Sequence, residues 1–295
     1  MKTSIRSFAK INLFLYVTSK RKDGYHNLYT LMTPIDLYDE LDLDYSYKRI
    51  KVCCDYKGVP EDDSNTAFRA AALFFSSVRK KKLDAEIGVA INIKKQIPPG
   101  AGLGGGSSNA AVILRVLNKT FRYPFSTKEL MAMGLAIGAD VPFFIFGRPA
   151  IATGVGEKLE PVTHLKHYHL VICDPGIVSS TPDVYKNIEF QLTANQKYNM
   201  KTGLNVPLRG QEFDIQGRLH NDLEKSACDL HPEIRQTKEE MACLLQREVY
   251  MTGSGASLFA LYSDQVSAQR GKNLLKKEWS QTPKKVFLSS FNTEN

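Results

Sequence analysis

The sequence lacks the long apolar runs of membrane-spanning proteins and the paired cysteines of disulfide-rich proteins. Its 295 residues include no apolar run near the roughly 18 residues that a transmembrane helix needs, so no membrane association is expected. The five cysteines are an odd number and form no Cys-x-x-Cys pair, which argues against a disulfide framework and against a structural zinc site. Neither a secretion signal nor a transit peptide is recognisable at the start, and we therefore expect a cytoplasmic protein.

Positive charge is in modest excess, with a formal net charge of +8. Such a charge suits an anionic ligand, and the basic run at residues 79–82 raises the question of nucleic acid. That run closes a helical pattern whose apolar stripe includes Ala67, Phe74 and Val78, and basic residues are favoured at helix C-termini. We therefore expect a small anionic ligand and no nucleic-acid partner.

The most informative segment is a glycine-rich loop at residues 98–108. Glycine adopts positive φ at little steric cost, so such a loop can bring several backbone N–H groups to one anion. A strand pattern precedes the loop and a helical pattern at 110–117 follows it, so its serines fall near a helix N-terminus that favours negative charge. We expect the loop to hold the phosphates of a nucleotide. Its residues are Pro98, Pro99, Gly100, Ala101, Gly102, Leu103, Gly104, Gly105, Gly106, Ser107 and Ser108.

Better-known glycine loops do not fit this segment. A P-loop requires a lysine directly after its last glycine, whereas the next lysine here is Lys119. The glycines satisfy Gly-x-Gly-x-x-Gly, but the acidic residue that a dinucleotide-binding fold needs about 20 positions later is missing. A protein kinase is excluded because the chain contains neither His-Arg-Asp nor Asp-Phe-Gly.

Two other segments carry candidate functional side chains. In the alternating pattern of residues 5–17, Lys10 and Asn12 share one face of a predicted strand. Asp140 lies between small residues and an apolar run, where a carboxylate at the edge of a core is a candidate for chemistry or for a helix cap. A second glycine turn at residues 252–256 is by itself a weak signal.

Three of these motifs occur in an order that resembles the GHMP small-molecule kinases. They are Phe-Ala-Lys-Ile-Asn-Leu at 8–13, the glycine loop continuing to residue 111, and Thr-Gly-Ser-Gly-Ala at 252–256. Two more, Asp-Gly-Tyr-His-Asn-Leu at 23–28 and Gly-Ala-Asp-Val-Pro-Phe-Phe at 138–144, resemble the branch that phosphorylates 4-diphosphocytidyl-2-C-methyl-D-erythritol in the non-mevalonate isoprenoid pathway. The similarity spans essentially the whole chain.

The resemblance implies an α+β fold of two lobes, with the active site in the cleft between them. We expect residues 1–155 to form the lobe with the ATP loop and the catalytic residues, and 156–295 the lobe that completes the substrate cleft. ATP and Mg²⁺ are the implied cofactors, with Ser107 or Ser108 near the metal and Asn65 near the adenine. The oligomeric state, monomer or homodimer, is left open.

The resemblance also assigns roles at the acceptor. Lys10 would keep Asp140 ionised and stabilise developing charge, while Asp140 would either accept the proton of the 2-hydroxyl or orient it. Tyr25 and His26 would bind the cytosine, and Asn12 the sugar-alcohol end. Thr181 and Tyr185 are further candidates for contacting the substrate.

Other functions remain to be weighed. A homoserine or mevalonate kinase would keep the glycine loop but needs no nucleobase pocket, which Tyr25 and His26 predict. A nonenzymatic nucleotide-binding protein should have lost Lys10 or Asp140, and both are present. An oxidoreductase using the Gly-x-Gly-x-x-Gly segment would bind a nicotinamide dinucleotide and work without ATP.

Overall fold

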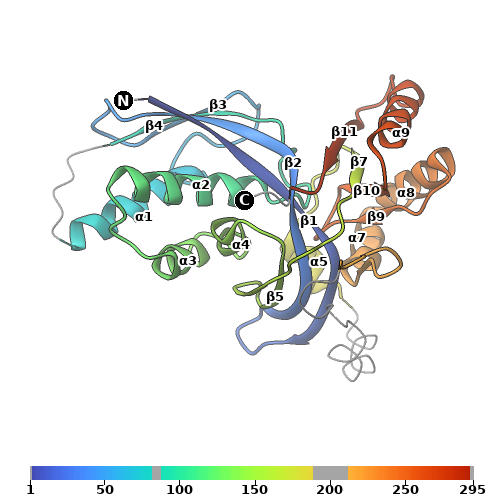
Figure 1. Ribbon diagram of the computed structural model, residues 1–295, viewed down its shortest axis with the longest axis horizontal. Coiled ribbons are helices and arrows are strands. Elements are labelled where there is room, and N and C mark those ends of the chain that lie inside the picture. The colour runs from blue at the N-terminus through green and yellow to red at the C-terminus, as the bar shows by residue number, and fades with distance from the viewer. Residues whose placement is uncertain (1, 82–87, 189–211, 293–295) are drawn as a thin grey trace. The chain divides into compact units, whose positions relative to one another are not determined.

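A computed structural model describes residues 2–81, 88–188 and 212–292 of the chain (Figure 1). Helices and strands are mixed along it, as the α+β prediction requires. The chain groups into two compact units, each built from separate segments. Unit 1 is Met1–Ala9, Tyr38–Pro99 and Gly104–Gly147, and unit 2 is Lys10–Leu37, Gly100–Leu103 and Arg148–Asn295. The predicted division near residue 155 stays a prediction.

The strands of unit 1 alternate between buried and exposed side chains. β3 (Lys51–Cys54) pairs in parallel with β4 (Ala90–Lys94), and β4 pairs antiparallel with the end of β2 (His26–Asp44). Leu41 and Leu43 on β2 are fully buried because successive side chains of a strand point to opposite faces. β4 leads into the glycine loop, because it ends at Lys94, five positions before Pro99 begins the turn.

The described helices of unit 1 form two layers on one side of these strands (Figure 1). The apolar stripe predicted on α1 (Thr66–Lys80) is buried, and the basic run that follows it is described as far as residue 81. α3 (Thr127–Leu135) begins with the predicted capping box of Ser126 and Glu129. In Figure 1, α1 and α2 (Gly105–Thr120) lie between the strands and the pair α3 and α4 (Val141–Phe146).

The start of α2 lies earlier than the sequence pattern indicated. The apolar periodicity begins at Ala110, but the helix begins at Gly105, within the glycine run. Gly104 is its N-cap with a φ of 72°, a left-handed conformation that glycine adopts at little cost. A Cβ on Gly105 would lie 2.7 Å from Nζ of Lys95 and would displace this ammonium from its buried pair with Asp39, so glycine is favoured there.

Unit 2 contains pieces of two long strands and a separate sheet. The second part of β1 (Lys2–Lys20) pairs in parallel with β8 (His220–Asn221). The first part of β2 pairs antiparallel with β5 (Ala150–Gly154), which in turn pairs with β6 (Lys158–Pro161). A four-stranded antiparallel sheet has the order β11 (Lys285–Ser290), β7 (His169–Asp174), β10 (Leu258–Tyr262) and β9 (Tyr250–Met251).

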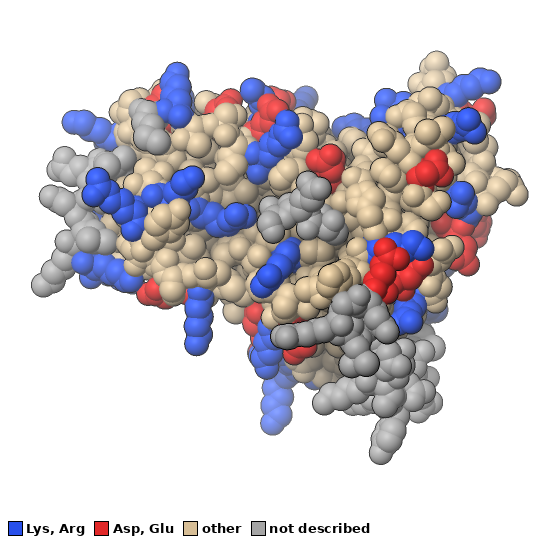
Figure 2. Space-filling view, in the orientation of Figure 1, with Lys and Arg blue, Asp and Glu red and all other residues tan. Residues whose placement is uncertain are grey.

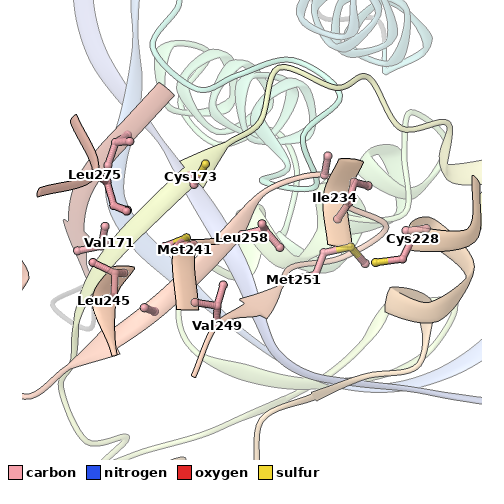
Figure 3. Close-up of a cluster of buried hydrophobic side chains, with 14 of the residues drawn as sticks. Val171, Cys173, Cys228, Ile234, Met241, Leu245, Val249, Met251, Leu258 and Leu275 are labelled. Carbon is pink, nitrogen blue, oxygen red and sulfur yellow. The ribbon is translucent and has the colours of Figure 1, made fainter. Parts of the chain in front are cut away.

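The core of unit 2 lies between that sheet and its helices. Sulfur and aliphatic side chains from β7, β9 and β10 meet those of α7 (Leu223–Leu230), α8 (Pro232–Leu245) and α9 (Gln265–Glu278) (Figure 3). Val171, Leu258 and Met251 are each at most 1% exposed. Burial of this apolar surface fixes the hairpin of β9 and β10, whose turn is the Thr-Gly-Ser-Gly-Ala motif.

Charged side chains of both signs lie on the face of the molecule that Figure 2 shows. On the face in Figure 2, Lys and Arg side chains are interspersed with Asp and Glu rather than gathered into one continuous patch. Within the described ranges, no helix is both long and apolar enough to cross a membrane.

Candidate functional site

The first turn of α2 in unit 1 has the features of an anion site. Its N-cap, Gly104, contributes no side-chain hydrogen bond to the backbone N–H groups of that turn. Gly106 is exposed, and the hydroxyl of Ser107 is half-buried without a hydrogen bond to any described residue. Ser108 differs, because its buried hydroxyl donates to the carbonyl of Phe8 at 2.6 Å and accepts from Ser7 at 2.7 Å. Ser107 is therefore the serine that can meet a ligand.

Asn65 stands beside this turn but is occupied by its own helix. Its side-chain oxygen caps α1 by accepting from the backbone of Ala67 at 2.8 Å, and its amide donates to the carbonyl of Pro60 at 2.6 Å. The next residue, Thr66, donates to the carbonyl of Gly106 at 2.7 Å. The start of α1 is thus tied directly to the start of α2.

Asp140 lies close to the same turn. It is half-buried at the N-terminus of α4, where its carboxylate makes no capping hydrogen bond. The capping role that the sequence left open is therefore absent. A Cβ on Gly138 would lie 3.5 Å from Oγ of Ser107, so Gly138, two residues before Asp140, lies beside Ser107 within unit 1.

Lys10 and Asn12 in unit 2 share a face of β1, as the alternation predicted. Nζ of Lys10 donates to Oδ1 of Asn12 at 2.6 Å, and both residues are buried. Nδ2 of Asn12 donates to the hydroxyl of Thr30 at 2.8 Å, and its backbone N–H donates to the hydroxyl of Thr252 at 2.9 Å. The Asn12 amide thereby orients the Lys10 ammonium.

The glycine-loop residues of unit 2, 100–103, rest on the turn at 252–256. The backbone of Ser257 donates to the carbonyl of Ala101 at 3.1 Å, and that of Lys10 donates to the carbonyl of Leu103 at 3.0 Å. A Cβ on Gly102, whose φ is 77°, would lie 2.4 Å from the carbonyl oxygen of Thr252. The two glycine segments thus approach so closely that no side chain fits between them.

An aromatic pair marks a second part of unit 2. The rings of His26 and Tyr185 stack with centroids 5.1 Å apart, so two predicted substrate residues meet. Burial, and to a lesser extent the charge of Lys20, lowers the pKa of His26, which keeps the imidazole neutral near pH 7. Tyr25 is 62% exposed, and the hydroxyls of Thr181 and Ser254 are 2.7 Å apart.

Sequence reasoning missed part of this arrangement. The turn at 252–256 was by itself a weak signal and served as one of three family motifs, but its contacts with Lys10 and Gly102 were not predicted. Asn221, which holds that turn through two hydrogen bonds, was not considered. No local pattern could have found it, because its partners lie about thirty residues away along the chain.

Comparisons with known proteins show which family the chain resembles. The chain matches the model of the GHMP kinases N terminal domain at residues 65–148 and that of the GHMP kinases C terminal at 210–281. It is 39% identical over 275 residues to the 4-diphosphocytidyl-2-C-methyl-D-erythritol kinase of Syntrophus aciditrophicus, covering 92% of this chain and 94% of the relative. With the enzyme of that name from Clostridium kluyveri the identity is 35% over 285 residues, 97% and 98% of the two chains.

Solved structures show the same fold. A crystal structure of 4-(cytidine 5'-diphospho)-2C-methyl-D-erythritol kinase has a TM-score of 0.74 and 31% identity, and the match covers 98% of this chain and 100% of that one. Homoserine kinase from Cytophaga hutchinsonii has a TM-score of 0.73 at 20% identity, covering 100% of this chain and 96% of that one. At that identity the second likeness concerns the fold alone.

Proposed function

Because the chain belongs to the 4-diphosphocytidyl-2-C-methyl-D-erythritol kinase family of the GHMP kinases, we propose that it phosphorylates the 2-hydroxyl of 4-diphosphocytidyl-2-C-methyl-D-erythritol with ATP. One observation carries the proposal, the 39% identity to such an enzyme over 92% of the chain. The reaction would be a step of the non-mevalonate isoprenoid pathway.

The first turn of α2 fits the phosphates of ATP. Its N–H groups lack a side-chain cap, and helix N-termini favour anions. Gly106 and the hydroxyl of Ser107 would hold the phosphates together with Mg²⁺, because Ser108 is already bound to Phe8 and Ser7. When bound, Mg²⁺ would neutralise charge on the phosphates.

Asp140 and Lys10 are the groups we propose for the acceptor hydroxyl. In the transfer, the hydroxyl oxygen forms a bond to the γ-phosphorus, the bond to the ADP oxygen breaks, and the hydroxyl proton leaves. A carboxylate such as Asp140 accepts that proton or orients the hydroxyl, since a loose transition state needs little early deprotonation. The Lys10 ammonium, held by Asn12, supplies positive charge where negative charge develops.

The cytidyl end of the substrate would bind near His26. A neutral imidazole has one donor and one acceptor, which is the pattern that recognition of a base edge requires. Tyr185 stacks on this ring and holds it in place, and Tyr25 is exposed for contact with the base. The substrates of homoserine and mevalonate kinases contain no nucleobase, so Tyr25 and His26 favour the cytidyl substrate.

The test is a coupled assay of ADP release with Mg-ATP and 4-diphosphocytidyl-2-C-methyl-D-erythritol, with homoserine and mevalonate as alternative acceptors. We expect turnover with the cytidyl substrate alone. Asp140→Asn should lower kcat by at least about 100-fold, the usual contribution of a positioned acid–base group. The matched control is Asp36→Asn, which changes an exposed aspartate of β2. Turnover only with homoserine or mevalonate would overturn the substrate assignment.

A further inference from the structure

Asn221 uses its whole side-chain amide to bind the backbone. Oδ1 accepts from the N–H of Leu223 at 3.0 Å, while Nδ2 donates to the carbonyls of Met251 at 2.9 Å and Gly253 at 2.8 Å. Two carbonyls and one N–H leave a single consistent orientation for the amide. Asn221 is itself held at the end of β8, in register with Leu15 of β1.

The turn that Asn221 binds lies against Lys10 and the glycine loop. A Cβ on Gly253 would lie 3.3 Å from Nζ of Lys10 and 3.4 Å from Oδ1 of Asn12. It would also lie 3.2 Å from the carbonyl oxygen of Gly102. Any displacement of Gly253 therefore reaches the ammonium and the glycine loop directly.

Other parts of the turn have further anchors besides Asn221. Met251 enters the turn from the core of unit 2, and Leu258 leaves it into the same core (Figure 3). On its other side, Ser179 donates to the carbonyl of Ser254 at 3.0 Å. The carbonyl of Gly253 lies between these anchors and is bound by Asn221.

We propose that Asn221 is a positioning residue for phosphoryl transfer. By fixing the carbonyl of Gly253, it sets the place of the Lys10 ammonium and of residues 100–103. The side chain of Asn221 forms its hydrogen bonds with Met251, Gly253 and Leu223, and not with His26 or Tyr185. We therefore expect binding of the cytidyl group to be independent of Asn221. The inference rests on the proposed roles of Lys10 and of the glycine loop.

Asn221→Asp tests this directly. The variant keeps the acceptor for Leu223 but places a carboxylate oxygen against two carbonyl oxygens. We expect kcat to fall about 100-fold, the effect of a small misplacement at a catalytic centre. The KM for ATP should rise, while the KM for the cytidyl substrate should stay within about twofold.

The pH profile separates positioning from structural support. In Asn221→Asp, the two carbonyls and the nearby carboxylates of Asp222 and Glu224 disfavour the charged form of the new carboxyl and raise its pKa. His220, paired with Asp222, is the other titratable group beside it, and the wild-type protein controls for its titration. The protonated carboxyl can donate one hydrogen bond again. The ratio of variant to wild-type kcat should therefore rise as the pH falls from about 8 to about 6. Loss of stability alone would lower the melting temperature and leave kcat and this ratio unchanged.

Asn118→Asp is the matched control. Asn118 in unit 1 is buried, whereas Asn221 is half-buried, and it likewise binds backbone through both ends of its amide, to the carbonyl of Phe125 at 2.9 Å and its N–H at 3.1 Å. We expect this variant to lose thermal stability without a change in kcat or in either KM. Should Asn221→Asp not fold, Asn221→Ser, which retains one donor, is measured in the same assays.

Titration calorimetry with ADP makes the test independent of turnover. Weaker ADP binding by Asn221→Asp, but not by Asn118→Asp, is expected even if the wild-type protein acts on another acceptor. Inactivity of the wild-type protein toward the cytidyl substrate would thus count against the proposed function alone. If Asn221→Asp has the same kcat, the same KM for ATP and the same affinity for ADP as the wild type, the proposed role of Asn221 is wrong.

Discussion

The hydroxyl of Ser7 on β1 donates to the hydroxyl of Ser108 on α2 at 2.7 Å, and both side chains are buried. Ser108 passes the hydrogen bond on to the carbonyl of Phe8 at 2.6 Å. These two hydrogen bonds link α2, the helix that follows the glycine loop, to β1. Two adjacent serines of one motif therefore differ, since Ser107 is half-buried and takes no part in these hydrogen bonds.

Ser107→Ala is expected to impair activity, and Ser108→Ala is expected to impair stability. Ser107→Ala should raise the KM for Mg-ATP and lower kcat while the melting temperature stays near that of the wild type. Ser108→Ala should lower the free energy of unfolding by about 1–3 kcal/mol, because Ser7 and Phe8 lose a buried partner. Steady-state kinetics and urea denaturation measure both. The same defect in both variants would contradict the assignment.

Gly102→Ala should abolish nucleotide binding. The new Cβ would lie 2.4 Å from the carbonyl oxygen of Thr252, and the φ of 77° is itself unfavourable for alanine. Ala101→Gly is the neighbouring control, because the Ala101 carbonyl keeps its bond to Ser257. The added backbone entropy should cost about 0.5–1 kcal/mol and the loss of the buried methyl about 0.8 kcal/mol. Titration with ADP compares them, and unimpaired binding by Gly102→Ala would argue against the close approach.

Lys95→Met should destabilise the protein strongly. Nζ of Lys95 lies 2.6 Å from the Asp39 carboxylate, with the two side chains 4% and 0% exposed. Removing one partner of a buried pair costs about 3–5 kcal/mol because the other charge stays buried. Adding Asp39→Asn should restore most of that loss. Lys94→Met, at a lysine 57% exposed, should change the free energy of unfolding by less than about 1 kcal/mol.

His26 should make stability depend on pH. Burial lowers the pKa of the folded imidazole, whereas the unfolded side chain titrates near about 6.5. As the pH falls through that value the unfolded state gains a proton first, so the free energy of unfolding decreases until the folded pKa is passed. His26→Phe keeps a ring for Tyr185 and should remove this component. Urea titrations between about pH 8 and about pH 5 measure it, and identical profiles would speak against the assignment.

His26→Phe also tests recognition of the base. The variant retains the ring stacked on Tyr185 but loses both ring nitrogens, so the KM for the cytidyl substrate should rise about tenfold, the effect of 1.4 kcal/mol. The KM for ATP should not change. Equal effects on both substrates would place the role of His26 elsewhere.

Much of the fold followed from local patterns. The stripe of α1, the capping box of α3 and the alternation that puts Lys10 beside Asn12 all agree with the structure. Boundaries were less accurate, because the periodicity placed α2 from Ala110 whereas it begins at Gly105. Apolar periodicity reports where a helix meets a core, and the first turn of α2 meets Lys95 and Ile97 through glycine.

The sequence by itself determined the family, the motif residues and most secondary structure, because these depend on residues within a few positions of one another. Only the tertiary structure decided that the Ser108 hydroxyl donates to the Phe8 carbonyl, that Tyr185 stacks on His26 and that Asn221 donates to the Gly253 carbonyl. These contacts depend on strand register and on how sheets and helices bury their apolar faces. That burial depends on residues far apart in the sequence, so it cannot be predicted from any short segment.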